Sequence, residues 1–303
     1  MACKYHFTDE ILNMMHAFGD SKAPLVESAR LIESIVRQQL DALIDKAGEV
    51  AQIRESAVIG AEDVLFLLRK DKSKLIRLIN HLYVKDIKSS IGDGTSNPAE
   101  ISINGTTRSR RVKICYDYLS QLDEFNEYKK VFNQALFDEI KNQRLRRIDS
   151  LTRNMSSLEY VVFTKARQVS FKPEKFSEWL LNDKPHIKIS VFAFEMIHYL
   201  AHETVAQIID LSLIVKQDSD RDPNDPLSVL ITRSAHNNSE KANVSLQPRS
   251  FNIPYNLSKP NRQSSCITPS HIHEALRRYS SSIGPYKEYF HKNRSSPWAI
   301  LCI

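Results

Sequence analysis

Apolar residues recur at intervals of three and four along one long early segment. The steps between them are 4, 3, 4, 4, 3, 4 and 3 residues, the spacing of one face of an α-helix, at Leu25, Ala29, Ile32, Val36, Leu40, Leu43, Ala47 and Val50. This pattern predicts a helix over residues 25–52. At 1.5 Å per residue such a helix is roughly 40 Å long, and its apolar face requires a partner along that length.

Shorter elements flank this helix on both sides. Thr8 can cap a preceding short helix, and Gly19 ends it, because glycine readily takes the left-handed conformation at a helix C-terminus. After the long helix the pattern predicts a short extended segment and two further helices, at residues 58–59, 63–69 and 75–82. The first unit therefore spans residues 5–83.

A second unit repeats this order over residues 171–281. A short helix with Pro173 in its first turn leads to a long helix over 190–217. That helix is apolar around most of its circumference, so other elements must cover most of its sides. Residues 218–266, rich in Asp, Asn, Ser and Pro, predict a long loop. The pair Thr268–Pro269, a cap followed by a first-turn proline, then predicts a last helix.

A linker and a helical connector join the two units. The linker, residues 84–112, contains three of the seven glycines and the basic run Arg108–Arg111. That run fits a nuclear import signal and the solvated edge of a loop equally well. The connector, residues 113–170, is helical in pattern but more polar, and the capping box Ser156–Glu159 predicts a helix start within it. The chain ends in a tail at 282–303.

The shared layout of short, long and short helix indicates the fold class. Such a unit is open and cannot bury its own central stripe. The histone fold solves this problem by pairing two copies, and two copies in one chain raise each other's effective concentration. We therefore predict an all-α protein in which two histone folds, joined by a helical linker, form an intramolecular pair. The predicted pairing core is Ile32, Val36, Leu40, Leu43, Ala47, Phe66, Ile197, Leu200, Val205 and Ile208.

The net charge of +6 lies mostly outside the two long-helix regions. Residues 1–82 carry 11 basic and 12 acidic side chains, net −1, and residues 154–217 carry 7 of each, net 0. The excess lies in 83–153, with 13 against 10, and in 218–303, with 11 against 7. A phosphate-binding face normally needs clustered Lys and Arg on the folded surface. We therefore do not expect direct DNA binding.

The sequence carries no signature of catalysis, a cofactor or a small-molecule substrate. It contains no P-loop, no G-x-G-x-x-G and no nucleophile–base motif, and no apolar run approaches the roughly 20 residues of a membrane helix. The four cysteines form no C-x-x-C, which fits a reducing compartment. His198 and His202 have a spacing that can share a metal. However, Tyr199 stands where a zinc protease has glutamate, so we expect interface histidines and no metal.

Two charged residues bracket the loop that precedes the third helix of the first unit. In histone folds an arginine in this loop often clasps an aspartate at the start of the next helix. Arg54 and Asp63 are candidates for such a clasp, although their spacing is slightly longer than usual. The alternative is that they are two unrelated surface charges.

Separated segments of both units carry a resemblance to a known family. They are FTDEI (7–11), EDVLFLLRKDK (62–72), FSEWL (176–180), YLAHETVAQIIDL (199–211) and TPSHIHEALRR (268–278). The first two resemble the first histone fold of the Spt-three (suppressor of Ty three) subunits of the SAGA coactivator, a fold similar to TBP-associated factor thirteen of TFIID. The others resemble that family's second histone fold, akin to TBP-associated factor eleven. The long 218–266 insert departs from the family pattern.

The resemblance implies a non-enzymatic coactivator subunit in the nucleus. Such proteins contact TBP, the TATA-box-binding protein, and help deliver it to promoters within SAGA-type complexes, beside other coactivator subunits, to regulate initiation by RNA polymerase II. Glu195, Glu203 and Asp210 are acids on an otherwise apolar helix, and they are candidates for contact with a basic surface of TBP. Alternatively, they mark the narrow solvated edge of that helix. Two rival functions stay open, a histone-like DNA-binding protein and an architectural scaffold of a TFIID-type complex.

Overall fold

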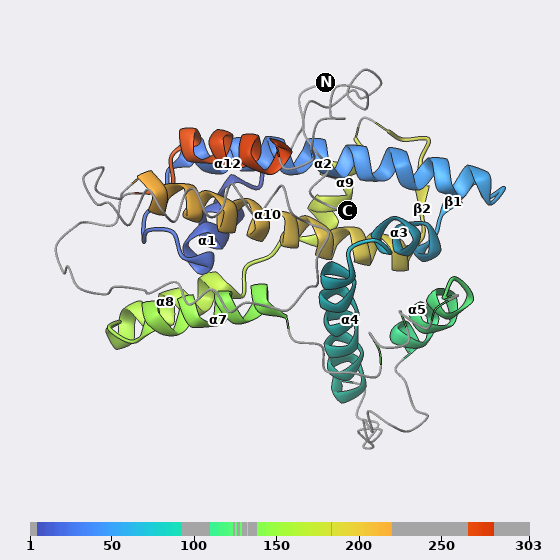
Figure 1. The fold of residues 1–303 in the computed structure, drawn as a ribbon, viewed down its shortest axis with the longest axis horizontal. Coiled ribbons are helices and arrows are strands. Elements are labelled where there is room, and N and C mark those ends of the chain that lie inside the picture. The colour runs from blue at the N-terminus through green and yellow to red at the C-terminus, as the bar shows by residue number, and fades with distance from the viewer. Residues whose placement is uncertain are drawn as a thin grey trace.

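The computed structural model (Figure 1) describes residues 5–92, 110–123, 138–182, 184–219 and 266–281, with Phe125, Tyr128 and Phe132. Helices form most of this described part. The first unit consists of α1 (Thr8–Phe18), α2 (Val26–Ile53), β1 (Val58–Ile59), α3 (Ala61–Leu68) and α4 (Lys72–Gly92). The second consists of α9 (Pro173–Leu181), β2 (Lys188–Ile189), α10 (Val191–Ser219) and α12 (Pro269–Ser281). None of these described helices has an apolar stretch long enough to cross a membrane.

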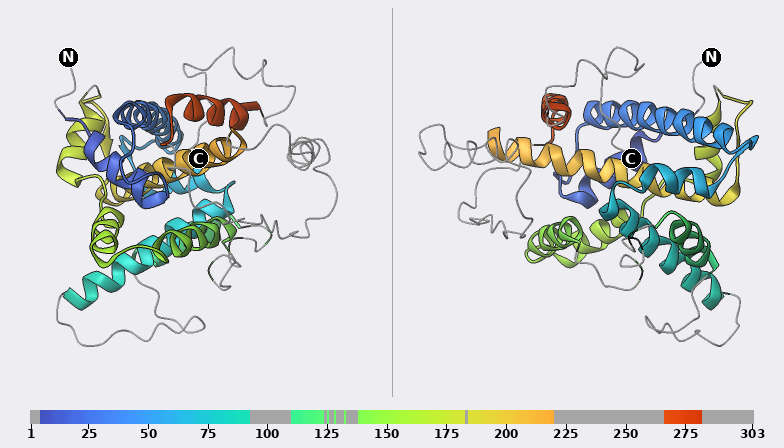
Figure 2. Two further views of the ribbon diagram at one scale, coloured as in Figure 1. Left: turned by 90° about the vertical axis from the view of Figure 1, so that its left-hand side faces the viewer. Right: turned by 45° about the vertical axis from the view of Figure 1, so that its right-hand side comes forward.

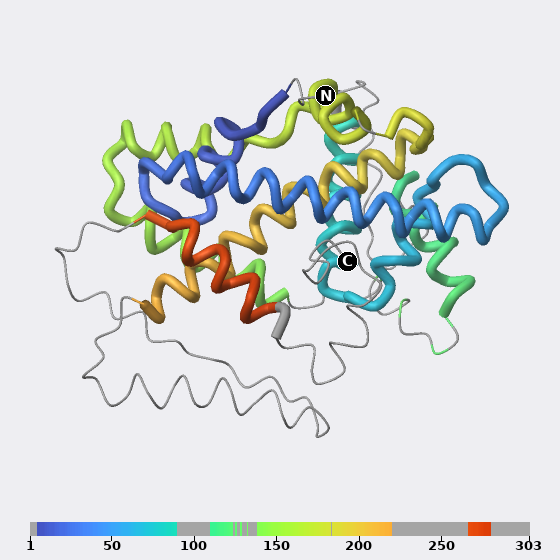
Figure 3. The backbone as a smooth tube through the Cα atoms, turned by 90° about the horizontal axis from the view of Figure 1, so that it is seen from above, coloured from blue at the N-terminus to red at the C-terminus, as the bar shows by residue number. Residues whose placement is uncertain are grey.

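The two long helices lie across each other, as Figure 3 shows from above. Their observed bounds agree within two residues with the prediction from apolar spacing. Short helices then pack on the opposite unit: α3 and α1 contact α10, while α9 and α12 contact α2. Each unit thus covers the apolar stripe that the other leaves open. The predicted all-α pair of histone folds within one chain is confirmed.

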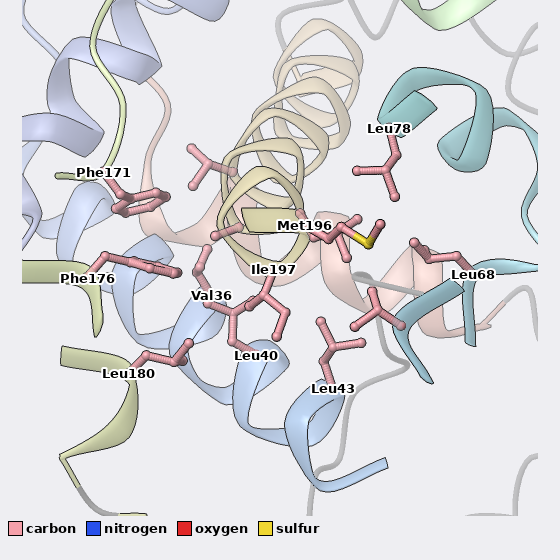
Figure 4. Close-up of a cluster of buried hydrophobic side chains, with 14 of the residues drawn as sticks. Val36, Leu40, Leu43, Leu68, Leu78, Phe171, Phe176, Leu180, Met196 and Ile197 are labelled. Carbon is pink, nitrogen blue, oxygen red and sulfur yellow. The ribbon is translucent and has the colours of Figure 1, made fainter. Parts of the chain in front are cut away.

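The core between the units is continuous (Figure 4). Val36, Leu40 and Leu43 of α2 point toward Met196 and Ile197 of α10. Every residue of the predicted pairing core is buried except one. That exception is Phe66, which corrects the prediction: it is only partly buried, and the guanidinium carbon of Arg69 lies 3.6 Å from the centre of its ring. A flanking arginine covers this ring, so it contributes little to the pairing core.

Aromatic rings join the units at the start of the chain. Phe7 lies edge-on to Phe171, with 5.1 Å between ring centroids, and edge-on to Trp179 at 5.5 Å. Both contacts cross from the first unit to the second. Edge-to-face pairs of this kind contribute about 0.5–1.5 kcal/mol beyond their buried area. They extend the interface beyond the crossing of the long helices.

The loops at the two ends of the pair meet in different ways. At one end β1 and β2 form a parallel bridge, with Val58 opposite Lys188 and Ile59 opposite Ile189. At the other end the loops are joined by a side chain and not by a strand pair: the Ile267 backbone N–H donates to Asp20 Oδ1 at 2.9 Å. Burial is the main cause that raises the pKa of Asp20. Neither junction can be read from local periodicity, since each joins segments far apart in the sequence.

The start of α1 differs from the prediction that Thr8 caps it. The helix begins at Thr8, and the N-cap position is Phe7, whose side chain cannot accept a hydrogen bond. Glu33 of α2 does so instead: Oε1 accepts from the Phe7 backbone N–H at 3.0 Å, and Oε2 accepts from the Thr8 hydroxyl at 2.9 Å. A carboxylate near a helix N-terminus also benefits from the helix dipole. The cap is therefore supplied by tertiary structure. Gly19 ends the helix as predicted, with φ 114°.

The connector is helical and lies against the pair in two places. α4 extends past residue 83 to Gly92, and α5 (Arg110–Gln121) lies beside it, so both ends of the proposed linker are helical. α7 (Glu139–Thr152) and α8 (Ser157–Arg167) follow each other under the other end of the pair (Figure 2), where α8 packs against α1. The predicted capping box Ser156–Glu159 starts α8. The greater part of the predicted long loop, residues 220–265, and the tail 282–303 lie outside the described residues.

Candidate functional site

Charged side chains gather where α10 meets the connector. Arg144 of α7 donates from Nη1 to Glu203 Oε2 at 3.1 Å and from Nε to Asp210 Oδ2 at 2.7 Å. Arg147, one turn further along α7, donates from Nη1 to Asp210 Oδ1 at 2.7 Å and to the Phe18 carbonyl at 2.8 Å. α7 is therefore fastened to α10 and to the end of α1 by charge-assisted hydrogen bonds, which are stronger than neutral ones.

A third arginine extends this cluster to α4. Arg77 Nε lies 3.1 Å from Glu203 Oε1, and its Nη1 donates to Asp138 Oδ1 at 3.1 Å. Asp138 in turn caps α7, accepting from the Lys141 backbone N–H at 3.2 Å. We call the cluster the α10 charge cluster; its members are Arg77, Asp138, Arg144, Arg147, Glu203 and Asp210, three cations and three anions. The charges balance, as buried ion pairs require.

Burial and attraction act in opposite directions on Arg144. Burial lowers its pKa, but the attraction of Glu203 and Asp210 outweighs burial, so the pKa of Arg144 is raised above its ordinary value. The guanidinium stays charged, and it can be buried only because both carboxylates face it. Removing either carboxylate would leave the three arginines of this region with only two carboxylates, and the uncompensated buried charge would cost more free energy than an intact ion pair contributes.

Glu195, one end of the predicted acidic set, belongs to a second group of charges. Its Oε2 accepts from Arg111 Nε at 2.9 Å, and Oε1 pairs with Lys85. Arg111 also pairs with Asp86 of α4, whose Oδ2 accepts the Arg111 backbone N–H at 3.1 Å. The hydrogen bond to Asp86 is the main cause that raises the pKa of Arg111. Arg111 comes from the basic run that fitted an import signal, and here it fastens α5 to α4 and α10; Arg108 lies outside the described residues.

The placement of the three acids corrects the sequence-based expectation. Glu195, Glu203 and Asp210 neither form a solvated edge nor face outward toward a partner, because only 12%, 8% and 16% of their side chains are exposed. Each is paired with at least one arginine of α4, α5 or α7. The arginines that pair with these acids are visible in the sequence, Arg111 in the linker and Arg144 and Arg147 in the polar connector, but nothing in their spacing shows which helix they face.

The loop before α3 contains a bidentate ion pair. Arg54 donates from Nη2 to Asp63 Oδ2 at 2.9 Å and from Nε to Oδ1 at 3.2 Å. The hydrogen bond to Asp63 is the main cause that raises the pKa of Arg54. Asp63 also accepts the Gly60 backbone N–H at 2.7 Å, which caps α3. The pair thus joins the end of α2 to the start of α3 and holds the loop that carries β1.

The two histidines of α10 make different contacts. His198 Nε2 lies 2.7 Å from the Phe171 carbonyl oxygen, and the ring of His202 packs on Phe18 with 5.5 Å between centroids. Burial is the main cause that lowers the pKa of His202, to about 4. Burial also lowers the pKa of His198. Within the described residues no three His, Cys, Asp or Glu side chains gather as metal ligands.

The chain matches known transcription proteins along both of its halves. Residues 5–94 match the family described as transcription initiation factor IID, 18 kD subunit. The SAGA complex subunit Spt3 of Schizosaccharomyces pombe is 30% identical over 236 residues, which cover 71% of this chain and 75% of that protein. The SAGA complex subunit SPT3 of Saccharomyces cerevisiae is 27% identical over an alignment that covers 91% of this chain and 92% of that protein. TFIID subunit 13 of Arabidopsis thaliana is 41% identical over 71 residues, covering 23% of this chain and 55% of its own.

Two histone folds paired within one chain, the first of the TFIID 18 kD type, define a histone-fold subunit of the transcription machinery. Ion pairs fasten α7 of the connector to α10 of the second fold. The chain belongs to the Spt3 family of SAGA complex subunits, and its role is that of a transcription coactivator subunit. The likeness of the second fold to TBP-associated factor eleven stays a prediction.

Proposed function

We propose that this protein binds TBP and helps deliver it to promoters as the Spt3-type subunit of a SAGA-type complex in the nucleus, beside other coactivator subunits and without catalysing a reaction. The observation that carries the proposal is the extent of the family match. It covers 91% of the chain in the S. cerevisiae relative, so it includes both histone folds and the connector between them. A match confined to the first fold would support only a generic pairing module.

The exposure of the acidic side chains supports one candidate surface for the proposed contact with TBP. Glu203 and Asp210 of the α10 charge cluster are already paired with arginines of the same chain, so they are not free to meet a basic partner. Glu49, near the end of α2, and Glu55, in the loop after it, are exposed. We assign the contact with a basic surface of TBP to these two carboxylates. Acidic groups on such a surface raise the association rate and fix orientation more than they add affinity.

The test measures binding of the purified chain to immobilised TBP by biolayer interferometry. We expect a saturable complex, and we expect Glu49→Lys with Glu55→Lys to slow association by about tenfold at low salt, with the difference shrinking as salt screens the charges. The matched control is Glu178→Lys, the same change at an exposed position of α9. Absence of binding by a chain with normal helical circular dichroism would overturn the proposal.

Biolayer interferometry also distinguishes TBP binding from the two rival functions, DNA binding and a purely architectural role. A histone-like DNA-binding protein would bind a DNA duplex with an affinity that falls steeply between low and moderate salt, because each neutralised phosphate releases counterions. A purely architectural subunit would bind neither TBP nor DNA while still assembling with other coactivator subunits. Hydrogen exchange of the TBP complex should protect the end of α2 and leave α7 unchanged.

A further inference from the structure

Helix α8 exposes an apolar stripe. Leu158 is 81% exposed, Val161 50% and Val162 61%. Together with Lys165 they stand at positions i, i+3, i+4 and i+7, so they share one face of the helix. Single exposed apolar side chains are ordinary on a protein surface, whereas grouped ones mark interaction sites. Three large aliphatic side chains are exposed together on this 11-residue helix.

The opposite face of α8 is anchored to the pair, so the direction of the stripe is set. Phe163 and Ala166 are buried, and the ring of Phe163 lies edge-on to His16 of α1 at 5.3 Å. Glu159 pairs with Lys22 in the loop after α1. α8 lies at the lower left in Figure 1, with α1 on its inner side. The stripe therefore points away from the histone folds.

Exposed cations border this stripe. Arg153 precedes the helix, and Lys165 and Arg167 lie in its last turn. The acid of α8, Glu159, is already paired with Lys22, and the helix N-terminus adds partial positive charge. Among the described residues, no ion pair involves these three cations. The surface is thus apolar along its middle and positive at both ends.

We propose that α8 is a docking surface for an acidic amphipathic helix of a partner protein. The 11 residues of α8 span about 16 Å, enough for roughly three turns of a partner helix laid along it. Leu158, Val161 and Val162 would receive the partner's apolar positions, and the bordering cations would meet its carboxylates. This site is independent of the proposed TBP contact, which uses acidic residues at the far end of α2 and a basic partner.

The mixture of side chains favours a protein over nucleic acid. A phosphate backbone offers counter-charge to Arg153 and Lys165 but nothing that would bury the leucine and valines between them. Protein interfaces instead combine an apolar centre with a polar, charged rim. The exposed aliphatic residues therefore favour a protein as the partner, and the cations favour an acidic one.

The experiment titrates the full-length chain into a fluorescently labelled acidic helical peptide, with leucine at i, i+3, i+4 and i+7 and Glu or Asp elsewhere, and reads anisotropy. Leu158→Ser with Val162→Ser should weaken binding by at least about tenfold. Lys165→Glu should weaken it severalfold at low salt and less at high salt. The matched controls are Ile53→Ser, which is 85% exposed on α2, and Lys88→Glu on α4, and both should bind like the parent.

Each alternative has its own outcome. Equal peptide binding by all variants, or none by the parent, would overturn the proposal. So would a DNA duplex that binds α8 with loss on Lys165→Glu but not on the serine variant. Peptide binding that appears only after residues 220–265 are deleted would assign the stripe to that segment of the chain instead. If the serine variant lost helicity, Lys165→Glu alone would decide. TBP binding should be unchanged in every α8 variant, so the two proposals fail separately.

Discussion

Arg144 on α7 and Glu203 on α10 form a hydrogen-bonded ion pair, Nη1 to Oε2 at 3.1 Å, across 59 residues of sequence. The pair fastens the connector to the second long helix beneath the place where the histone folds cross. Glu203 also pairs with Arg77 of α4, so this one carboxylate of α10 joins its helix to both α7 and α4. Its role in the fold is therefore to hold the connector, and any effect of its loss on partners would be indirect.

We predict that Glu203→Lys destabilises the protein by about 3–5 kcal/mol, because it leaves two buried arginines facing a third cation. Chemical denaturation monitored by circular dichroism measures this difference. The exposed Glu178→Lys, which makes the same charge change, should shift stability by no more than about 0.5 kcal/mol. An unchanged unfolding midpoint for Glu203→Lys would show that the α10 charge cluster does not hold the connector.

We predict that Leu43→Asp prevents the chain from folding. Leu43 is fully buried between the long helices, and an unpaired charge there costs several kcal/mol, comparable with the whole stability of a domain. Leu43→Met, which keeps volume and apolarity, should cost less than about 1.5 kcal/mol. Far-ultraviolet circular dichroism and gel filtration separate the two variants, and a soluble, fully helical Leu43→Asp chain would remove this residue from the core.

The two members of the loop ion pair should differ in their effect. Asp63 is buried and accepts from Arg54 and from the Gly60 backbone N–H, so Asp63→Ala should cost about 2–3 kcal/mol. Arg54 is 43% exposed, so solvent screens its charge and Arg54→Ala should cost about 1 kcal/mol or less. A double-mutant cycle from urea denaturation gives the coupling directly. Equal costs for the single variants would contradict the assignment of the cap to Asp63.

Acid should weaken the fold through His202. Burial first, then the nearby Arg144, lowers its pKa in the fold to about 4, from about 6.5 when unfolded. The unfolded chain therefore binds a proton that the folded chain refuses, so this stability is complete above pH 6.5 and is lost as pH falls toward 4. Between pH 7.5 and 5 the loss from this residue should be on the order of 2 kcal/mol.

Denaturation of His202→Gln at the two pH values checks this expectation. The variant should show a smaller loss of stability on acidification than the parent chain. The exposed His273→Gln serves as the control and should keep the parent's pH dependence. The same slope in all three proteins would place the acid sensitivity elsewhere, and His81 and His198 would be the next groups to examine because burial lowers their pKa values too.

Helix identity and fold class followed from the sequence because they rest on local repetition. The spacing of Leu40, Leu43 and Ala47 continues for seven turns, and no other arrangement of a chain puts residues at that period on one face. The segment 190–217 is apolar around most of its circumference, so other helices had to pack on it, and the presence of two units with the same layout indicated which ones. Capping signals such as Gly19 and Ser156 were equally legible, since they act within one turn of the helix they end or begin.

Partners across the fold were decided only by the tertiary structure. Glu33 caps a helix 26 residues away in sequence, and Thr8, the local candidate, donates to it instead. The sequence predicts Glu203 to be a solvated or partner-facing acid, whereas in the fold α7 packs beside α10 and Arg144 pairs with it. Charged side chains carry no periodic signature of what they face, because a single long-range ion pair leaves the helical spacing of both residues unchanged. The sequence by itself determined which helices form and that they must pair; only packing in three dimensions decided which charges are buried and which faces, such as that of α8, remain for partners.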